Sequence, residues 1–399
     1  MFYTSCSFTP HQERLEPVTL EEKIEARNRL EKARKEFYSL LTSKVKTRSI
    51  ESGESHETYI TNESITNIEV TITNQVSGEI ITTNLIITNF SVSTNTYEMS
   101  PMDVLYAKGM LEINAGETNA VDNYLKDIGL YDEAMEIKEK YELDKAMKTL
   151  YSPTGTKNQT DDFYTNFLKT GDILLSIGPS SQGTSIAAPF IPGTWKHAGL
   201  MDKREYNKNR IWFIFTASNK TRESQEVVRE YYILWWKIQE KRGACVGWES
   251  IKQWKDEWCV SAYRVKGYSE TKGQNALDYV KQFIRKKFAF LVPVSKWVDA
   301  RWEWRYVEFR LFGWWGPLVG TWCWVWVPGH YEITTKPFTK ENNEYWYCTK
   351  VAYRAWKSQN INIEYSGGRW DPWVSPDDIR DSLKDGTIEH IGGNDPWNP

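Results

Sequence analysis

Tryptophan is confined to one part of this 399-residue chain. All 20 tryptophans lie between Trp195 and Trp397, and none precedes Trp195. So abrupt a step in composition favours two fold units, and the chain is long enough for more than one domain. We therefore expect a flexible tail at residues 1–17, an N-terminal region of helices and strands at residues 18–160, and an aromatic-rich C-terminal domain at residues 161–399.

The N-terminal region changes character twice. Thr19 and Glu22 have the spacing of a capping box, which predicts a helix over residues 18–45. Residues 55–98 are rich in Thr, Ile, Asn and Val and alternate locally, which predicts two or three antiparallel strands. Residues 101–150 return to a helical pattern. Because no catalytic pattern occurs here, we expect a structural or adaptor-like role.

Charge and cysteine spacing argue against several classes of function. The formal net charge is −3, which does not suit a general nucleic-acid binder or a protein that binds strongly anionic membranes. The cysteines form no Cys-x-x-Cys pair and no Cys/His ligand spacing, so we expect no zinc site or other metal. A Cys245–Cys259 disulfide is possible in an oxidising compartment, but the favoured interpretation is buried free thiols. The five cysteines are Cys6, Cys245, Cys259, Cys323 and Cys348.

The first residues leave two interpretations open. The segment Met-Phe-Tyr-Thr-Ser-Cys has no basic stretch and no long apolar run, so as written it is not a signal peptide. Its end nevertheless resembles the end of a bacterial lipoprotein signal. In that case Cys6 is the lipidated residue, the true start lies upstream, and the protein resides in the bacterial cell envelope or periplasm. If the chain begins at Met1, the segment is a frayed tail and the protein is cytoplasmic.

The C-terminal domain has an α+β pattern. Residues 179–194 are predicted to form a long loop, because they consist largely of small residues and proline. Short apolar strands are predicted at residues 172–177, 195–201, 211–217 and 260–265, and helices at residues 272–287 and 348–357.

Cys348 begins the last of these helices. The positions three, four, seven and eight residues after it are all apolar, which places Cys348 on the buried face near the first turn. The partial positive charge and free N–H groups of a helix N-terminus favour a thiolate and can stabilise an oxyanion. Cys348 is therefore a candidate nucleophile, and the alternative is a small core residue at a helix start.

His197 is the candidate general base, in the strand predicted at residues 195–201. An antiparallel hairpin centred on Tyr206-Asn207 would set His197 opposite Thr216, and a shift of the centre by one residue would set it opposite Ser218. Either hydroxyl could accept a hydrogen bond from the far imidazole nitrogen and orient the ring. The alternative is a structural histidine on a half-buried strand.

Four segments of the chain lie at residues 171–173, 197–200, 347–352 and 375–378. In this order they resemble the permuted papain-like amidases of the YiiX/YaeF type, a branch of the NlpC-type cysteine peptidase superfamily. In that branch the histidine strand precedes the cysteine helix, as it does here. The resemblance covers roughly residues 165–392 and implies a circularly permuted papain-like fold, an antiparallel sheet packed on the cysteine helix, and catalysis without a cofactor. The segments are Gly171-Asp172-Ile173, His197-Ala198-Gly199-Leu200, Tyr347-Cys348-Thr349-Lys350-Val351-Ala352 and Ser375-Pro376-Asp377-Asp378.

Two positions depart from this family pattern. The third catalytic residue of the family is usually a glutamate on the strand after the histidine strand, where this chain has Thr216. A threonine can orient an imidazole but stabilises imidazolium less well than a carboxylate. Lys350 stands where the family has an acidic residue, and could lower the pKa of the thiol or bind a substrate carboxylate.

The remaining site candidates follow from position alone. His330, in Pro-Gly-His-Tyr-Glu-Ile, is the rival base. The candidates for substrate or oxyanion binding are Tyr347, Lys350, Ser218 and Trp195.

A run of residues without charge, 311–328, reaches the length of a candidate membrane span. Its glycines and proline break a helix, and tryptophan prefers the membrane interface to the bilayer centre. We expect a buried strand pair, or else an aromatic platform beside the site that contacts glycan or lipid.

These patterns predict a cysteine-dependent amidase or peptidase with Cys348 as nucleophile, His197 as base and Thr216 as orienting residue. The resemblance implies cell-wall peptides or lipid-linked groups as substrates. One alternative is a catalytically degenerate envelope protein that binds glycan or lipid through its Trp-rich surface. The other is an acyltransferase or thioesterase that uses the same Cys–His pair.

Overall fold

The structure is a computed structural model of the whole chain. It describes residues 18–52, 63–64, 68–73, 80–85, 91–92, 99–151, 162–178, 188–208, 211–233, 236–298, 301–310, 318–327, 330–337, 339–365 and 373–395.

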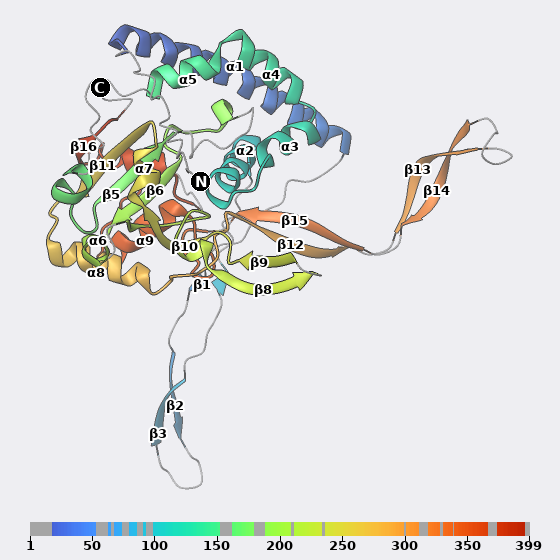
Figure 1. The fold of residues 1–399 in the computed structure, drawn as a ribbon. Coiled ribbons are helices and arrows are strands. Elements are labelled where there is room, and N and C mark those ends of the chain that lie inside the picture. The colour runs from blue at the N-terminus through green and yellow to red at the C-terminus, as the bar shows by residue number, and fades with distance from the viewer. Residues whose placement is uncertain are drawn as a thin grey trace.

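The described part of the chain combines helices with an antiparallel sheet, so the predicted α+β class is confirmed (Figure 1). The α-helices are α1 (Leu20–Ser52), α2 (Pro101–Met110), α3 (Ala120–Asp127), α4 (Tyr131–Lys140), α5 (Leu143–Tyr151), α6 (Lys203–Lys208), α7 (Ile251–Lys255), α8 (Glu270–Lys281), α9 (Cys348–Lys357) and α10 (Pro376–Asp381). Short helical segments of other types are η1 (Leu111–Ala115), η2 (Phe163–Phe167), η4 (Ala188–Phe190) and η5 (Glu223–Gln225).

Six strands form one sheet, in the order β10-β7-β6-β5-β11-β16, and every neighbouring pair is antiparallel. Four of them, β5, β6, β7 and β11, match strands predicted from the sequence to within two residues at each end. The strands are β5 (Ile173–Ile177), β6 (His197–Met201), β7 (Trp212–Ser218), β10 (Cys245–Ser250), β11 (Cys259–Val265) and β16 (Ile388–Gly393).

The other described strands pair outside this sheet (Figure 1). The predicted antiparallel strands of the N-terminal region are present as β2 with β3 and as β1 with β4. The uncharged run contributes β14, which pairs with β13, while residues 311–317 and 328 lie outside the described residues. These strands are β1 (Glu63–Ser64), β2 (Ile68–Thr73), β3 (Ile80–Leu85), β4 (Ser91–Val92), β8 (Val227–Ile233), β9 (Trp236–Lys241), β12 (Leu291–Val298), β13 (Arg301–Arg310), β14 (Leu318–Val327) and β15 (His330–Pro337).

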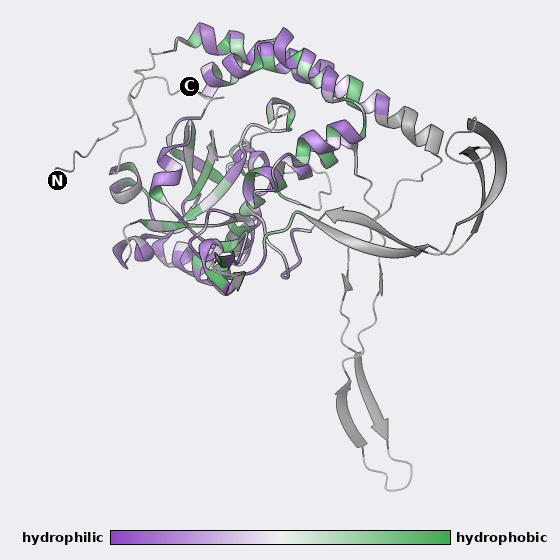
Figure 2. Ribbon diagram, turned by 45° about the vertical axis from the view of Figure 1, so that its right-hand side comes forward, coloured by the Kyte–Doolittle hydropathy of each residue, from purple (hydrophilic) through white to green (hydrophobic). Residues whose placement is uncertain are grey.

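Side-chain alternation gives the sheet two covered faces. Ile173 and Leu175 of β5 belong to a large core cluster with α9, whereas Leu174 between them belongs to a smaller cluster with Trp254 of α7. The central strands are accordingly largely hydrophobic in Figure 2. Helix α9 packs against β6 and β7, so the predicted contact between the cysteine helix and the sheet is present.

The large cluster also contains the N-terminal helices. Leu30 and Phe37 of α1, Leu125 of α3 and Tyr151 of α5 are part of the same continuous core as Cys348. The predicted boundary at residue 160 therefore does not separate two cores. The N-terminal helices contribute Ala, Leu, Ile and Phe to this shared core, whereas the tryptophans in it come from the C-terminal region.

Candidate active site

Helix α9 begins at Cys348, as predicted. Its N-cap residue, Tyr347, has extended backbone and makes no side-chain cap, and the first backbone bond of the helix runs from the Val351 N–H to the Tyr347 carbonyl at 3.2 Å. The N–H groups of the first turn therefore have no side-chain cap. The predicted buried face is confirmed, because Val351, Ala352, Ala355 and Trp356 are fully buried.

His197 is the first residue of β6. Leu200 pairs with Phe215 and Met201 with Ile214, and continuing this register sets His197 opposite Ser218 rather than Thr216. The second of the two predicted hairpin registers is therefore the one present. The His197 side chain is only 8% exposed.

A carboxylate holds the His197 ring. The Nε2 atom of His197 lies 2.9 Å from Oε2 of Glu249, which is on β10. Trp254 Nε1 donates to the same oxygen at 2.8 Å, and the Ser218 hydroxyl donates to the other oxygen, Oε1. Because both oxygens accept hydrogen bonds, Glu249 can remain ionised while its side chain is 2% exposed.

The prediction that Thr216 orients the imidazole is wrong. The Thr216 hydroxyl donates to the backbone carbonyl of Ala198 at 2.5 Å, across the β6–β7 pair. Threonine therefore does not replace the carboxylate in this site, since Glu249 supplies one from the next strand of the sheet. Ser218 contributes indirectly, by fixing the Glu249 carboxylate instead of the ring.

The electrostatics couple His197 to both neighbours. Burial lowers the pKa of His197, but the Glu249 carboxylate and the Cys348 thiol outweigh it and raise this pKa to about 10. Burial raises the pKa of Glu249, but His197 and, more weakly, Lys220 and Ser218 bring it down to about 2. Near neutral pH the imidazolium and the carboxylate therefore form a buried ion pair.

The second ring nitrogen of His197, Nδ1, does not contact Glu249 through the hydrogen bond described above. Nδ1 is buried and makes no hydrogen bond of ordinary geometry with the described residues, while Cys348 is the other group that raises the His197 pKa. The thiol and the ring therefore interact without an aligned hydrogen bond. Such loose geometry is common in ligand-free active sites and tightens when substrate binds.

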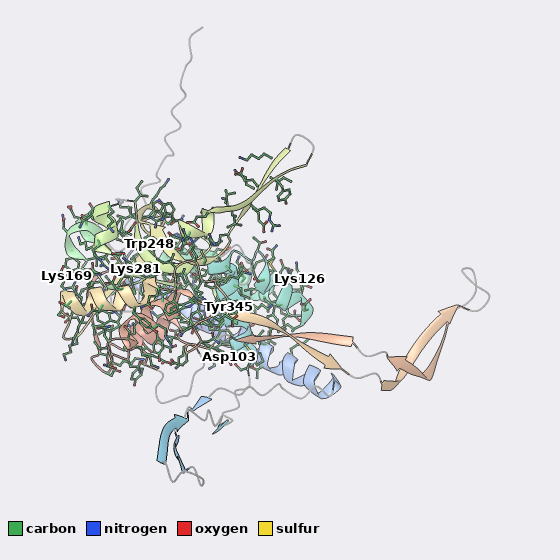
Figure 3. All side chains as sticks on the ribbon, turned by 90° about the horizontal axis from the view of Figure 1, so that it is seen from below. Asp103, Lys126, Lys169, Trp248, Lys281 and Tyr345 are labelled. Carbon is green, nitrogen blue, oxygen red and sulfur yellow. The ribbon has the colours of Figure 1, made fainter. Side chains whose placement is uncertain are left out.

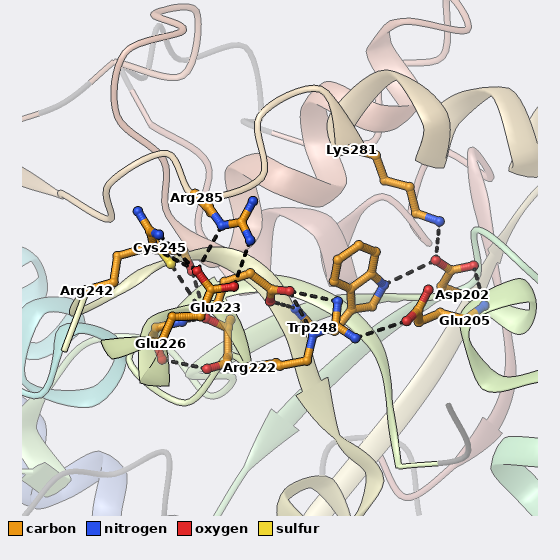
Figure 4. A network of polar contacts seen from close by, with 12 residues as sticks. Asp202, Glu205, Arg222, Glu223, Glu226, Arg242, Cys245, Trp248, Lys281 and Arg285 are labelled. Atoms are coloured by element: carbon orange, nitrogen blue, oxygen red, sulfur yellow. Dashed lines mark hydrogen bonds and ion pairs between the residues drawn. The ribbon is translucent and has the colours of Figure 1, made fainter. Parts of the chain in front are cut away.

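A charged network holds the strands on either side of β7 in place (Figure 4). Asp202, directly after β6, accepts a hydrogen bond from Trp248 Nε1 at 3.2 Å and pairs with Lys281. The Trp248 N–H donates to Glu223 at 2.9 Å, and Lys281 lies 5.4 Å from the centre of the indole ring (Figure 3). Asp202 directly follows β6, and Trp248 directly precedes Glu249 on β10. These contacts therefore help to position the strands that carry His197 and Glu249.

The segment before His197 is held by buried charges. The Lys196 ammonium donates to the carbonyls of Ile191, Pro192 and Gly193 at 2.9, 2.8 and 2.6 Å. Asp377, from the Ser-Pro-Asp-Asp segment, accepts the Thr194 N–H at 2.8 Å. Burial raises the pKa of Asp377 to about 6, and burial lowers that of Lys196 well below its ordinary value.

The other predicted site residues are structural in this conformation. Lys350 is fully buried and donates to the carbonyls of Thr339 and Tyr345, both at 2.9 Å, so it does not face a substrate carboxylate. Burial lowers the pKa of Lys350 to about 7. The Tyr347 hydroxyl accepts the Val374 N–H at 3.2 Å. Trp195 is fully buried, and its indole N–H has no partner among the described residues.

The remaining sequence predictions are placed as follows. His330 begins β15, outside the six-stranded sheet, and so is not on the sheet that carries His197. Cys245 and Cys259 are buried free thiols, as predicted. Cys6 and the tail at residues 1–17 lie outside the described residues.

Glu249 is the main site residue that sequence reasoning missed. A signal existed, because Cys-Val-Gly-Trp-Glu-Ser places one acid in an otherwise uncharged strand. Ser250 and Gln253 then form a capping box that begins α7, which carries Trp254. A single acidic residue in an otherwise uncharged strand, directly before a helix start, indicates a buried carboxylate and therefore a candidate site residue.

Within the described ranges, no cluster of three or more His, Cys, Asp or Glu side chains could hold a metal ion. Of the helices in those ranges, none has the length and apolar character needed to cross a bilayer. Comparison of the chain with protein-family models, with curated proteins and with solved structures finds no match.

Proposed function

We propose that the chain is a cysteine-dependent hydrolase that cleaves an amide bond, with a circularly permuted papain-like catalytic domain. Cys348 is the nucleophile, and His197 is general base and then general acid. Glu249 orients the imidazole and stabilises its charged form. The observation that carries the proposal is the buried His197 ring, which contacts the Glu249 carboxylate and whose pKa is raised by both Glu249 and Cys348.

The charge distribution supports this assignment of roles. A ring with a pKa of about 10 keeps its proton at neutral pH. A nearby imidazolium favours the thiolate, which is the reactive form of catalytic cysteines. The uncapped first turn of α9 offers backbone N–H groups to the oxyanion that forms when the thiolate attacks a carbonyl.

The substrates we propose are cell-wall peptides or lipid-linked acyl amides, as the YiiX/YaeF resemblance implies. We also propose a bacterial cell-envelope or periplasmic location. We do not propose an adaptor-like role for the helices before residue 152, since these helices share the core of the catalytic sheet.

The argument for a degenerate, purely binding protein rested on Thr216 at the carboxylate position. Glu249 removes that argument, because a carboxylate contacts the ring from β10. A thioesterase or acyltransferase is the second candidate. Cys348 is fully buried in the large hydrophobic core, and an apolar setting of this kind favours an acyl group.

The pH dependence of Cys348 alkylation by iodoacetamide, read by mass spectrometry, tests the Cys–His pair. We expect a midpoint well below the free-thiol pKa of about 8.5, and an upward shift in His197→Ala. Cys245 is the internal control, because burial raises its pKa to about 11. The proposal would be contradicted if the Cys348 alkylation midpoint lay near the free-thiol value and did not change in His197→Ala.

Turnover then separates the candidate reactions. Murein-type peptides, lipid-linked amides and fatty-acyl thioesters are the probes, with Cys348→Ser as the inactive control. Cleavage of amides supports the amidase assignment. Cleavage of acyl thioesters alone selects the thioesterase, and turnover that survives in Cys348→Ser rejects the cysteine mechanism.

A further inference from the structure

One polar group near the nucleophile has no role in the site as described above. Tyr106 belongs to α2, in the N-terminal half of the chain, and is 6% exposed. Its hydroxyl is buried and has no hydrogen-bond partner among the described residues. An unpaired buried hydroxyl costs stability, so a hydroxyl kept in such a position calls for an explanation.

Aromatic contacts lead from Tyr106 to the start of the cysteine helix. The Tyr106 and Phe290 rings meet edge to face, with centroids 5.7 Å apart. Phe290 in turn meets Tyr347, the residue before Cys348, with centroids 4.8 Å apart. Tyr106 is thus fixed in place by packing against the same aromatic group that supports the N-terminus of α9.

The electrostatics of Tyr106 are consistent with these contacts. Burial raises the pKa of Tyr106 well above its ordinary value, and the next contribution comes from the charge of Cys348, followed by Asp378 and Asp377. The phenol therefore keeps its proton near neutral pH. A phenol that keeps its proton can donate a hydrogen bond and cannot act as a base.

We propose that the Tyr106 hydroxyl is the second donor of the oxyanion hole, together with the backbone N–H of Cys348. This inference rests on the proposed cysteine chemistry and adds a catalytic residue from the N-terminal helices. It gives the unpaired hydroxyl a partner that exists only during the reaction. It also explains why α2 packs into the core of the catalytic sheet, where Leu105 and Ala107 on either side of Tyr106 are fully buried.

The reaction of a small activated ester isolates this role. The Cys348 thiolate attacks the carbonyl carbon of p-nitrophenyl acetate, a C–S bond forms, and the π pair of the carbonyl moves to the oxygen. Tyr106 and the Cys348 N–H would bind that oxyanion. The pair returns to carbon as the C–O bond breaks, which releases p-nitrophenolate and leaves an acetyl thioester. Because p-nitrophenolate leaves without a proton, the His197 imidazolium first releases its proton to solvent. Neutral His197 then takes a proton from water, the hydroxide attacks the thioester carbonyl, and the C–S bond breaks. This step restores the thiolate and the imidazolium and releases acetic acid, which loses its proton to solvent.

Alkylation by iodoacetamide uses the same thiolate but forms no oxyanion, because it displaces iodide at a saturated carbon. The experiment therefore compares the two rates at Cys348 in the full chain and in Tyr106→Phe. We expect acylation, followed as the p-nitrophenolate burst, to slow by about 10²-fold. Alkylation, its pH midpoint and the melting temperature should stay close to those of the unsubstituted protein.

Tyr151→Phe is the matched control. Tyr151 also belongs to the N-terminal helices, is 1% exposed and has a buried hydroxyl without a partner among the described residues, but its ring stacks on Trp258, with centroids 6.3 Å apart, and not on Phe290. This control should acylate and alkylate like the unsubstituted protein.

Each other outcome has a distinct meaning. Equal acylation rates in Tyr106→Phe and the unsubstituted protein would overturn the oxyanion role. A parallel loss of acylation and alkylation would also overturn it, since packing would then be the cause. If Cys348 of the unsubstituted protein reacts with neither reagent, the proposed cysteine hydrolase itself fails, and the inference with it.

Discussion

His197 Nε2 lies 2.9 Å from Glu249 Oε2, although their strands, β6 and β10, are separated in the sheet by β7. In the backbone pairing Glu249 is opposite Ile214 and Ser218 is opposite Cys245, so it is the side chains that bring His197, Ser218 and Glu249 together on one face of the sheet. Ser218, on the strand between, donates to the far oxygen of the same carboxylate. The unit that orients the ring is therefore built from three adjacent strands.

Glu249→Gln should lower turnover by on the order of 10²- to 10⁴-fold, because an amide cannot stabilise the imidazolium and can select the wrong tautomer of His197. The pH midpoint of Cys348 alkylation should rise at the same time. Steady-state turnover of the substrate found above is the measurement. Glu226→Gln is the control, since Glu226 pairs with Arg242 and Arg285 away from the ring. Full activity in Glu249→Gln would contradict the assigned role.

The Glu249–His197 pair should stabilise the fold only within a window of pH. The pKa of Glu249 is lowered from 4.5 to about 2, so its contribution is present above about pH 4.5 and is lost as the pH falls toward 2. The pKa of His197 is raised from 6.5 to about 10, so its contribution is complete below about pH 6.5 and is lost as the pH rises through 10. The difference in unfolding free energy between the unsubstituted protein and Glu249→Gln should therefore be largest between about pH 4.5 and 6.5. Urea unfolding across pH measures this difference, and a value independent of pH would argue against the coupling.

Trp254→Phe should cost about 1.5–3 kcal/mol of stability, because it removes a hydrogen bond to a buried charged group. The bond in question runs from Trp254 Nε1 to Glu249 Oε2 at 2.8 Å. Trp356→Phe is the matched comparison, since Trp356 is equally buried and donates to the neutral carbonyl of Gly171 at 3.1 Å. That variant should lose only about 0.5–1.5 kcal/mol. Equal losses in urea unfolding would show that the Glu249 bond is not charge-assisted.

Lys196→Met should destabilise the segment before His197 by about 1–3 kcal/mol. Arg34 still donates to the carbonyls of Ile191 and Gly193 in this variant, but the Pro192 carbonyl is left with no donor among the described residues. Melting temperature and urea unfolding are the measurements. Lys208→Met, at an exposed position, should change neither by more than a few tenths of a kcal/mol. Unchanged stability in Lys196→Met would mean that water replaces the ammonium.

Local patterns in the sequence were enough to predict Cys348 at a helix start and His197 on a strand. Apolar spacing fixes which face of a helix is buried, and alternation fixes which residues share a face of a strand. Neither pattern says which strand lies next to which. The hairpin β8–β9 separates β7 from β10 in the sequence, and their pairing is a long-range contact, so Glu249 could not be placed beside His197 from local patterns alone.

The prediction for Thr216 failed for the same reason. It assumed that the third residue of the site comes from the strand next to the histidine strand. In the structure, β7 supplies Ser218, and the carboxylate comes from one strand further. Composition also says nothing of the core that the two regions share, since it records which side chains a segment uses and not which core they enter.

The shared core determines whether residues 161–399 can be expressed as a separate fragment. A fragment that starts at residue 161 would carry Cys348, His197 and Glu249, but it would expose the apolar side chains that now pack against α1, α2 and α5. Such a fragment is not a portable module, and we expect it to aggregate when expressed by itself. Any transfer of the candidate site into another protein would therefore have to include the N-terminal helices.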